Sequence, residues 1–209
     1  MKTVKLVLLL FFLMGISGCS HVKEYIEIAR DDVISDRYLD MLNRYTQEKT
    51  VYNAFETTIR IVSTWKNREF TNAYLSEYSR LYLLTGTDKE KRSEILSDAS
   101  SDFREFLFYA YIPDRESNDF SKPESVWKIF SYDDGEERLE PLDIREINTT
   151  PLVTKLFPYV KPYGKFYSVK FPLHPPSNQV DTALGKGPKL IFTGVLGKIE
   201  LQWSGIKKD

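Results

Sequence analysis

Proline and glycine are unevenly distributed along this chain of 209 residues. All ten prolines lie at or after Pro113, and residues 20–85 contain neither proline nor glycine. Proline removes a backbone donor and glycine destabilises a helix, so the first half can be mostly helical and the second half cannot. The sequence therefore favours an α+β protein in which helices come before strands.

Apolar side chains in the first half recur at intervals of three and four residues, which is typical of amphipathic helices. Ser35 is a good N-cap residue for the first of these helices, and Gly86 suits the C′ position of the second. We expect helices over three segments: 36–62, 67–85 and 87–110. The pattern predicts an antiparallel helical bundle over residues 19–112.

After residue 124 the apolar pattern changes to a period of two, which indicates strands. The preceding segment, 113–124, is rich in turn-forming and charged residues, and we predict it to be a linker. We expect strands over six segments: 126–132, 138–142, 152–157, 166–171, 189–193 and 198–203. Asp133-Asp134-Gly135 and the segment 194–197 have the composition of hairpin turns. These features predict an antiparallel β-sandwich of immunoglobulin-like type over residues 125–209.

The first twenty residues have the features of an export signal. Lys2 and Lys5 precede the apolar segment 6–16, which is shorter than the about 20 residues of a membrane-spanning helix and fits a signal-peptide core. The run closes with Ile16-Ser17-Gly18-Cys19, which resembles the lipobox of bacterial lipoproteins. The resemblance implies that residues 1–18 are a signal peptide, cleaved between Gly18 and Cys19. It also implies diacylglycerol on the Cys19 thiol and a further acyl chain, such as palmitate, on the new amine.

The position of the cysteine carries consequences for localisation and stability. Ser20 stands where an aspartate would retain a Gram-negative lipoprotein at the inner membrane, so the resemblance implies an outer-membrane protein that faces the periplasm. Cys19 is the sole cysteine, so a lipidated chain has no disulfide and depends on its core. No flexible spacer follows Cys19, so we expect the body to lie near the bilayer. The alternative is an ordinary secretory signal with an incidental cysteine.

Side chains that commonly carry catalysis are scarce in this chain. Its two histidines are His21 and His174, and a lipidated Cys19 leaves no free thiol, which disfavours a zinc site and a nucleophilic hydrolase. The acidic segment 133–137 lacks the spacing of an EF-hand, and segment 184–189 lacks that of a P-loop. We predict no catalytic residue, no metal site and no cofactor. Carboxylate chemistry stays open, because two of the 30 acidic residues facing one another in a cleft would suffice for glycan hydrolysis.

Charge is distributed as unevenly as proline. Residues 148–209 hold nine lysines against three acids, whereas acids outnumber basic residues in the segment 19–147. This asymmetry makes Lys186, Lys189 and Lys198 candidates for a surface that binds a partner. One alternative is that these lysines only oppose edge-to-edge pairing of strands. Another is that the acidic helical half docks on the basic strands within one molecule.

Tyrosines recur on the second predicted helix with the spacing of one helical face. They form a stripe that is either an aromatic binding surface or the rim of the core, and consist of Tyr74, Tyr78 and Tyr82.

Taken together, these features predict a lipid-anchored protein of the bacterial envelope. We expect it to bind an envelope protein or polymer, without catalysis and without a nucleic-acid partner. The alternative is a carboxylate-dependent hydrolase that acts on envelope glycans.

Overall fold

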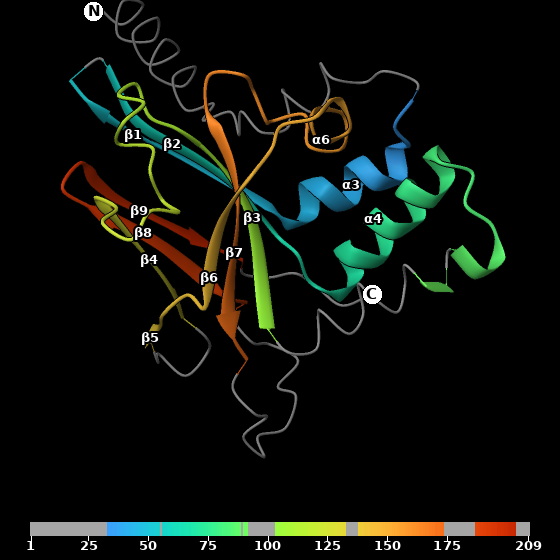
Figure 1. The fold of residues 1–209 in the computed structure, drawn as a ribbon. Coiled ribbons are helices and arrows are strands. Elements are labelled where there is room, and N and C mark those ends of the chain that lie inside the picture. Colours follow the sequence, from blue (N-terminus) through green and yellow to red (C-terminus); the bar gives the residue numbers. More distant parts are fainter. Residues whose placement is uncertain are drawn as a thin grey trace, which may run out of the picture.

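The computed structural model describes residues 33–54, 56–88, 90–91, 103–132, 138–173 and 187–203. The predicted signal peptide and Cys19 lie outside these residues, as do His21, His174 and Lys186. The described chain forms three layers: a layer of helices, a five-stranded sheet and a four-stranded sheet (Figure 1).

Both sheets are antiparallel throughout. The larger sheet has the order β1-β2-β3-β7-β6. Its strands are β1 (Thr46–Asn53), β2 (Glu56–Trp65), β3 (Phe103–Tyr111), β6 (Asp143–Ile147) and β7 (Lys165–Pro172). The smaller sheet has the order β5-β4-β8-β9. Its strands are β4 (Trp127–Tyr132), β5 (Arg138–Leu139), β8 (Lys189–Gly194) and β9 (Gly197–Gln202).

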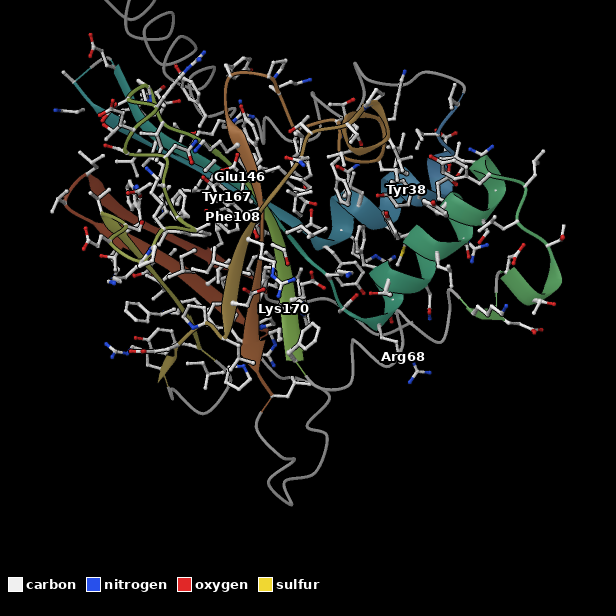
Figure 2. All side chains as sticks on the ribbon, viewed as in Figure 1. Tyr38, Arg68, Phe108, Glu146, Tyr167 and Lys170 are labelled. Atoms are coloured by element: carbon white, nitrogen blue, oxygen red, sulfur yellow. The ribbon has the colours of Figure 1, made fainter. Side chains whose placement is uncertain are left out.

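Aromatic side chains fill the core between the two sheets. Phe108 of β3 stacks on Tyr167 of β7 and meets Phe192 of β8 edge to face, with ring centroids 5.0 Å apart in both pairs (Figure 2). Trp203 is buried in the same core and donates its indole N–H to the carbonyl of Tyr45, 2.7 Å away. The beginning and the end of the described chain are thus held together through this core.

The helices cover the other face of the larger sheet. They are α3 (Asp36–Tyr45), α4 (Arg68–Leu81) and α6 (Pro151–Leu156). Tyr38 of α3 and Phe70 of α4 are buried against Leu107 of β3 and Phe166 of β7 in a second core. Because Phe108 faces the first core and Leu107 the second, β3 is buried on both faces.

The predicted N-terminal helical bundle is wrong. Ser35 is the N-cap of α3 and α4 begins where expected, but residues 46–65 form the β1–β2 hairpin and residues 103–111 form β3. The segment 46–65 is rich in β-branched side chains, which favour a pleated strand over a helix. Its turn needs no glycine, because Ala54 adopts a φ of 53°.

The second half of the chain contains four strands close to where they were predicted and differs from the prediction elsewhere. The strand predicted at 138–142 is only the two-residue β5, and β6 was not predicted. The predicted turn at 133–135 lies outside the described residues. The strands β4, β7, β8 and β9 and the turn between β8 and β9 are confirmed. The segment 152–157 was predicted as a strand and instead lies mainly in α6, because Thr150 caps its N-terminus and Pro151 occupies its first turn.

The sandwich is not confined to residues 125–209, because β1, β2 and β3 form more than half of the larger sheet. The predicted order, a helical bundle followed by a separate immunoglobulin-like sandwich, is therefore wrong. Strands from both halves of the chain build the larger sheet, and the helices pack on one of its faces. Strand β3, which precedes the predicted linker 113–124 in sequence, pairs with β7, which follows it. Within that segment Asn118 is buried, donates to the Ala110 carbonyl and accepts from the Tyr167 hydroxyl, both at 2.9 Å.

Candidate functional site

Two of the three lysines singled out by the sequence lie on one surface, the outer face of the smaller sheet. Apolar side chains of β4, β8 and β9 alternate into the core, so the residues between them face outward. We call this surface the lysine face, and it consists of Lys128, Phe130, Tyr132, Lys189, Ile191, Thr193, Lys198, Glu200 and Gln202. The helices of the described chain pack on the other sheet, so they leave the lysine face open (Figure 1).

Glu200 lies between the two predicted lysines. The Lys198 Nζ is 2.5 Å from one of its carboxylate oxygens and the Lys189 Nζ is 3.6 Å from the other. The hydrogen bond from Lys198 lowers the pKa of Glu200, and the same bond raises the pKa of Lys198. The face carries three lysines, with Lys128 as the third, so Glu200 offsets one of the three charges and the other two leave the face positive.

Two aromatic rings on the lysine face lie close to cationic groups. The Lys189 Nζ is 5.7 Å from the centroid of the Tyr132 ring, and the Arg138 guanidinium carbon is 4.5 Å from that of Phe130. Both rings are only partly buried and lie beside positive charge, in the arrangement of a cation–π contact. Sequence reasoning did not single out Phe130 or Tyr132, although their alternation with Ile129 and Ser131 was a usable signal.

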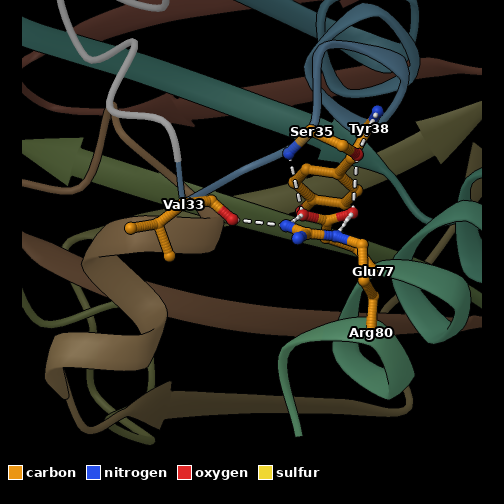
Figure 3. Close-up of polar contacts among 5 residues, drawn as sticks. All are labelled: Val33, Ser35, Tyr38, Glu77 and Arg80. Atoms are coloured by element: carbon orange, nitrogen blue, oxygen red, sulfur yellow. Dashed lines mark hydrogen bonds and ion pairs between the residues drawn. The ribbon is translucent and has the colours of Figure 1, made fainter. Parts of the chain in front are cut away.

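A second cluster joins the beginning of α3 to the end of α4 (Figure 3). One oxygen of the buried Glu77 carboxylate accepts from the Ser35 backbone N–H at 2.9 Å, and the other accepts from the Ser35 hydroxyl at 2.6 Å. The Arg80 guanidinium also binds Glu77, at 2.6 Å, and donates to the carbonyl of Val33. We call Val33, Ser35, Glu77 and Arg80 the α3–α4 clamp.

The charge of the clamp is stabilised in the folded state. Burial acts to raise the pKa of Glu77, but the hydrogen bonds from Arg80 and Ser35 outweigh it, so this pKa lies below its ordinary value. The same contact with Glu77 raises the pKa of Arg80. Beneath the clamp, Tyr38 donates its hydroxyl to the Leu156 carbonyl at 2.9 Å, which ties α3 to α6 as well.

The tyrosine stripe of α4 runs from the core to the surface. Tyr74 stacks on Phe157 of the second core, with centroids 6.2 Å apart. Tyr78 follows at 6.2 Å from Tyr74, and Tyr82 lies 4.5 Å from Tyr78. Tyr82 is 51% exposed, so the stripe is core rim at its first residue and free surface at its last.

A row of alternating charges crosses the larger sheet on the same side as the helices. In register, Lys66 neighbours Glu105, Glu105 pairs with Lys170, and Lys170 pairs with Asp143. Glu105 accepts from the Lys66 ammonium and from the Ser168 hydroxyl, both at 2.6 Å. Opposite charges on neighbouring strands stabilise the sheet. At the end of the row Asp143 also pairs with Arg145, at 2.6 Å, and the Lys170 ammonium lies 3.9 Å from the centroid of the Phe103 ring.

A glycan hydrolase would need two carboxylates that face one another in a cleft. Among the described residues the buried acids are Glu77 and Asp119. Glu77 belongs to the helical layer, whereas Asp119 accepts from the Ser125 hydroxyl at 2.7 Å beside Phe120 of the core between the sheets. The two lie on opposite faces of the larger sheet and form no pair. The part of the chain that the structure describes also contains no cluster of His, Cys, Asp and Glu side chains suited to a metal ion.

Within the described ranges, no helix is both long enough and apolar enough to cross a membrane. No family model matches the chain, and no curated protein matches it. A solved structure, that of a protein of unknown function from Burkholderia pseudomallei K96243, is similar with a TM-score of 0.40 and 9% sequence identity. The similarity covers 79% of this chain and 81% of that one.

Proposed function

We propose that the protein is a lipoprotein of the bacterial envelope, which holds a folded body at a membrane and acts by binding rather than by catalysis. The observation that carries this proposal is the sole cysteine at position 19, directly behind a signal-like apolar core and the residues Ile16-Ser17-Gly18. Two or more acyl chains make a stable membrane anchor, because each buried methylene contributes about 0.8 kcal/mol.

The length of chain after Cys19 keeps the body near the lipid. Val33, the first described residue, lies 14 positions after Cys19. A segment of that length reaches about 21 Å as a helix and about 50 Å when fully extended. The clamp fixes Val33 and Ser35 to α4, so the described chain begins at the helical layer. Confinement to a membrane raises the effective concentration of the body for partners in the same envelope.

The lysine face is the surface that we propose for the partner, an envelope protein or polymer. Lys128 and Lys198 are exposed on it, and the rings of Phe130 and Tyr132 are only partly buried. A strand face with cationic groups and aromatic rings offers both long-range attraction for anionic groups and flat apolar contact area.

The anchor is tested by labelling cells with an alkyne analogue of palmitate and measuring the mass of the N-terminal peptide. The unchanged chain should carry label and begin at a diacylated Cys19, whereas Cys19→Ala should carry none. Ser20→Ala is the matched control and should keep the label. Ser20→Asp should move the labelled protein from the outer to the inner membrane of a Gram-negative host. Label that survives Cys19→Ala would contradict the proposed anchor.

The binding surface is tested with a photo-reactive amino acid placed at one position of the lipidated protein in native membranes. A probe at Lys128, on the lysine face, should capture a recurrent partner. A probe at Lys155, an exposed lysine on α6 in the helical layer, is the control and should not capture the same partner. Capture of the same molecules from both positions, or of none from Lys128, would contradict the proposal that this face binds the partner.

A further inference from the structure

Helix α4 ends in a backbone arrangement that ordinarily favours glycine. The Leu84 N–H donates to the Ser79 carbonyl at 2.9 Å, and the Leu83 N–H donates to the Arg80 carbonyl at 3.4 Å. These two bonds form a Schellman motif with Leu83 at the C′ position. Gly86, which the sequence placed there, lies three residues further on. Leu83 accordingly adopts a φ of 51°, in the left-handed region that is unfavourable for a residue with a side chain.

The side chain of Leu83 packs against little of the protein, so packing does not offset the strained backbone. The Leu83 side chain is 84% exposed, and its neighbour Tyr82 is 51% exposed. Val33 is also 51% exposed and lies beside the end of α4, because Arg80 binds its carbonyl (Figure 3). Val33, Tyr82 and Leu83 are thus three exposed, largely apolar side chains at the end of α4, and we call them the anchor corner. A non-glycine residue held at positive φ with its side chain in solvent points to a use for that side chain outside the fold.

We propose that the anchor corner, Val33, Tyr82 and Leu83, inserts into the surface of the bilayer that holds the lipid on Cys19. This inference rests on the proposed lipidation. Val33 is the described residue nearest in sequence to Cys19, so the length of the intervening segment limits how far the corner can lie from the membrane.

The chemistry of the corner fits a bilayer better than a protein partner. A stable protein interface buries about 800 Å² on each partner, far more than three side chains provide. Contact with a bilayer requires no such area, because the acyl chains already hold the protein at the membrane and a few side chains suffice to orient the body. Leucine and valine suit the acyl boundary, and the phenol of Tyr82 suits the headgroup level. Arg80, whose side chain is 50% exposed, can extend toward lipid phosphates while it keeps its contact with Glu77.

The test uses the full lipidated protein with a single thiol at the corner. A lipidated Cys19 leaves no other free cysteine, so Leu83→Cys can be labelled alone with an environment-sensitive fluorophore. The protein is placed in vesicles of phosphatidylethanolamine and phosphatidylglycerol, and quenching is compared between a nitroxide carried on lipid and iodide in water. Val195→Cys is the matched control, because Val195 is 85% exposed in the β8–β9 turn, on the opposite side of Figure 1 from the end of α4.

The expected result is that lipid nitroxide quenches the probe at residue 83 at least fivefold more than the probe at residue 195, with the reverse order for iodide. Equal quenching at the two positions would overturn the inference, and so would shielding of residue 83 from both quenchers, which would mean that protein covers the corner. The mass of the N-terminal peptide is measured on the same sample. An unacylated Cys19 would refute the proposed function, whereas an acylated protein with a water-exposed residue 83 would refute this inference alone.

Discussion

Replacing Glu77 by glutamine removes the charge at the centre of the α3–α4 clamp and keeps the size of the side chain. The carboxylate accepts hydrogen bonds from the Ser35 N–H, the Ser35 hydroxyl and two nitrogens of Arg80. Every one of these partners is a donor. A glutamine keeps one acceptor oxygen, but its NH₂ group must face a donor, so part of the clamp is left without a partner.

The expected loss follows from the burial of the carboxylate. A hydrogen bond to a charged group contributes about 1.5–3 kcal/mol and a neutral one about 1 kcal/mol. The Glu77 side chain is only 4% exposed, but that of Arg80 is 50% exposed, so solvent screens the ion pair and its share is small. We expect Glu77→Gln to lower the free energy of unfolding by about 2–3 kcal/mol. For a body of this size the melting temperature should fall by about 5–10 °C.

The same substitution predicts a dependence on pH. The pKa of Glu77 in the folded state lies below its ordinary value of 4.5. A carboxyl group of this kind stabilises the fold fully above its unfolded pKa and loses that stabilisation as the pH falls through the folded pKa. The difference in stability between the unchanged protein and Glu77→Gln should therefore be constant at neutral pH. It should shrink once the pH falls below about 4.5.

Thermal unfolding followed by near-ultraviolet circular dichroism measures both effects. Glu140→Gln is the matched control, because the Glu140 side chain is 70% exposed and its pair with Arg138, at 3.2 Å, lies on the surface. This control should change the stability by less than about 0.5 kcal/mol. Equal melting temperatures for the two variants, or a Glu77→Gln deficit that persists unchanged into acid, would refute the reasoning.

Three further substitutions are tested by the same unfolding assay. Leu83→Gly should stabilise the fold by about 0.5–1 kcal/mol because it relieves the positive φ, and a destabilised variant would contradict the strain at that position. Asn118→Ala should cost about 1–2 kcal/mol, since it removes the donor to the buried Ala110 carbonyl, whereas the Tyr167 hydroxyl keeps its bond to the backbone carbonyl of residue 118; a loss below about 0.5 kcal/mol would contradict this. Gly164→Ala should lower the free energy of unfolding by about 2 kcal/mol, because the new Cβ would lie 2.5 Å from the Ala110 carbonyl oxygen. An unchanged melting temperature would show that the loop shifts to accommodate the methyl group at no cost.

The distribution of proline and glycine constrained the fold less than it first indicated. The absence of both residues from 20–85 permits a helix but does not require one. The β1–β2 hairpin forms within that segment because Ala54 takes the positive φ that a tight turn needs. The run of Thr, Val and Ile across 46–65 was the signal that competed with the three-and-four spacing, and in the structure β propensity prevails.

Strand β3 illustrates a limit of periodicity. The sequence Phe103-Arg-Glu-Phe-Leu-Phe-Tyr-Ala-Tyr111 has no alternation after Glu105, because the strand is buried by the other sheet on one face and by helices on the other. A short continuous apolar run fits a buried strand and a buried helix equally well. Its pairing with β7, more than 50 residues away in sequence, decides between them and is not encoded in any local pattern.

The candidate sites show the same division between local and distant information. Alternation placed Lys189 and Lys198 on strands, and pairing of β8 with β9 brings both to Glu200. The clamp could be predicted only in part: Ser35 was identified as an N-cap, but Glu77 is 42 residues away in sequence. Many acidic side chains could have served as its partner, and only the packing of α3 on α4 selects one. The residues that join the proposed anchor to the body are therefore set by tertiary contact, whereas Cys19 is set by a motif of four consecutive residues.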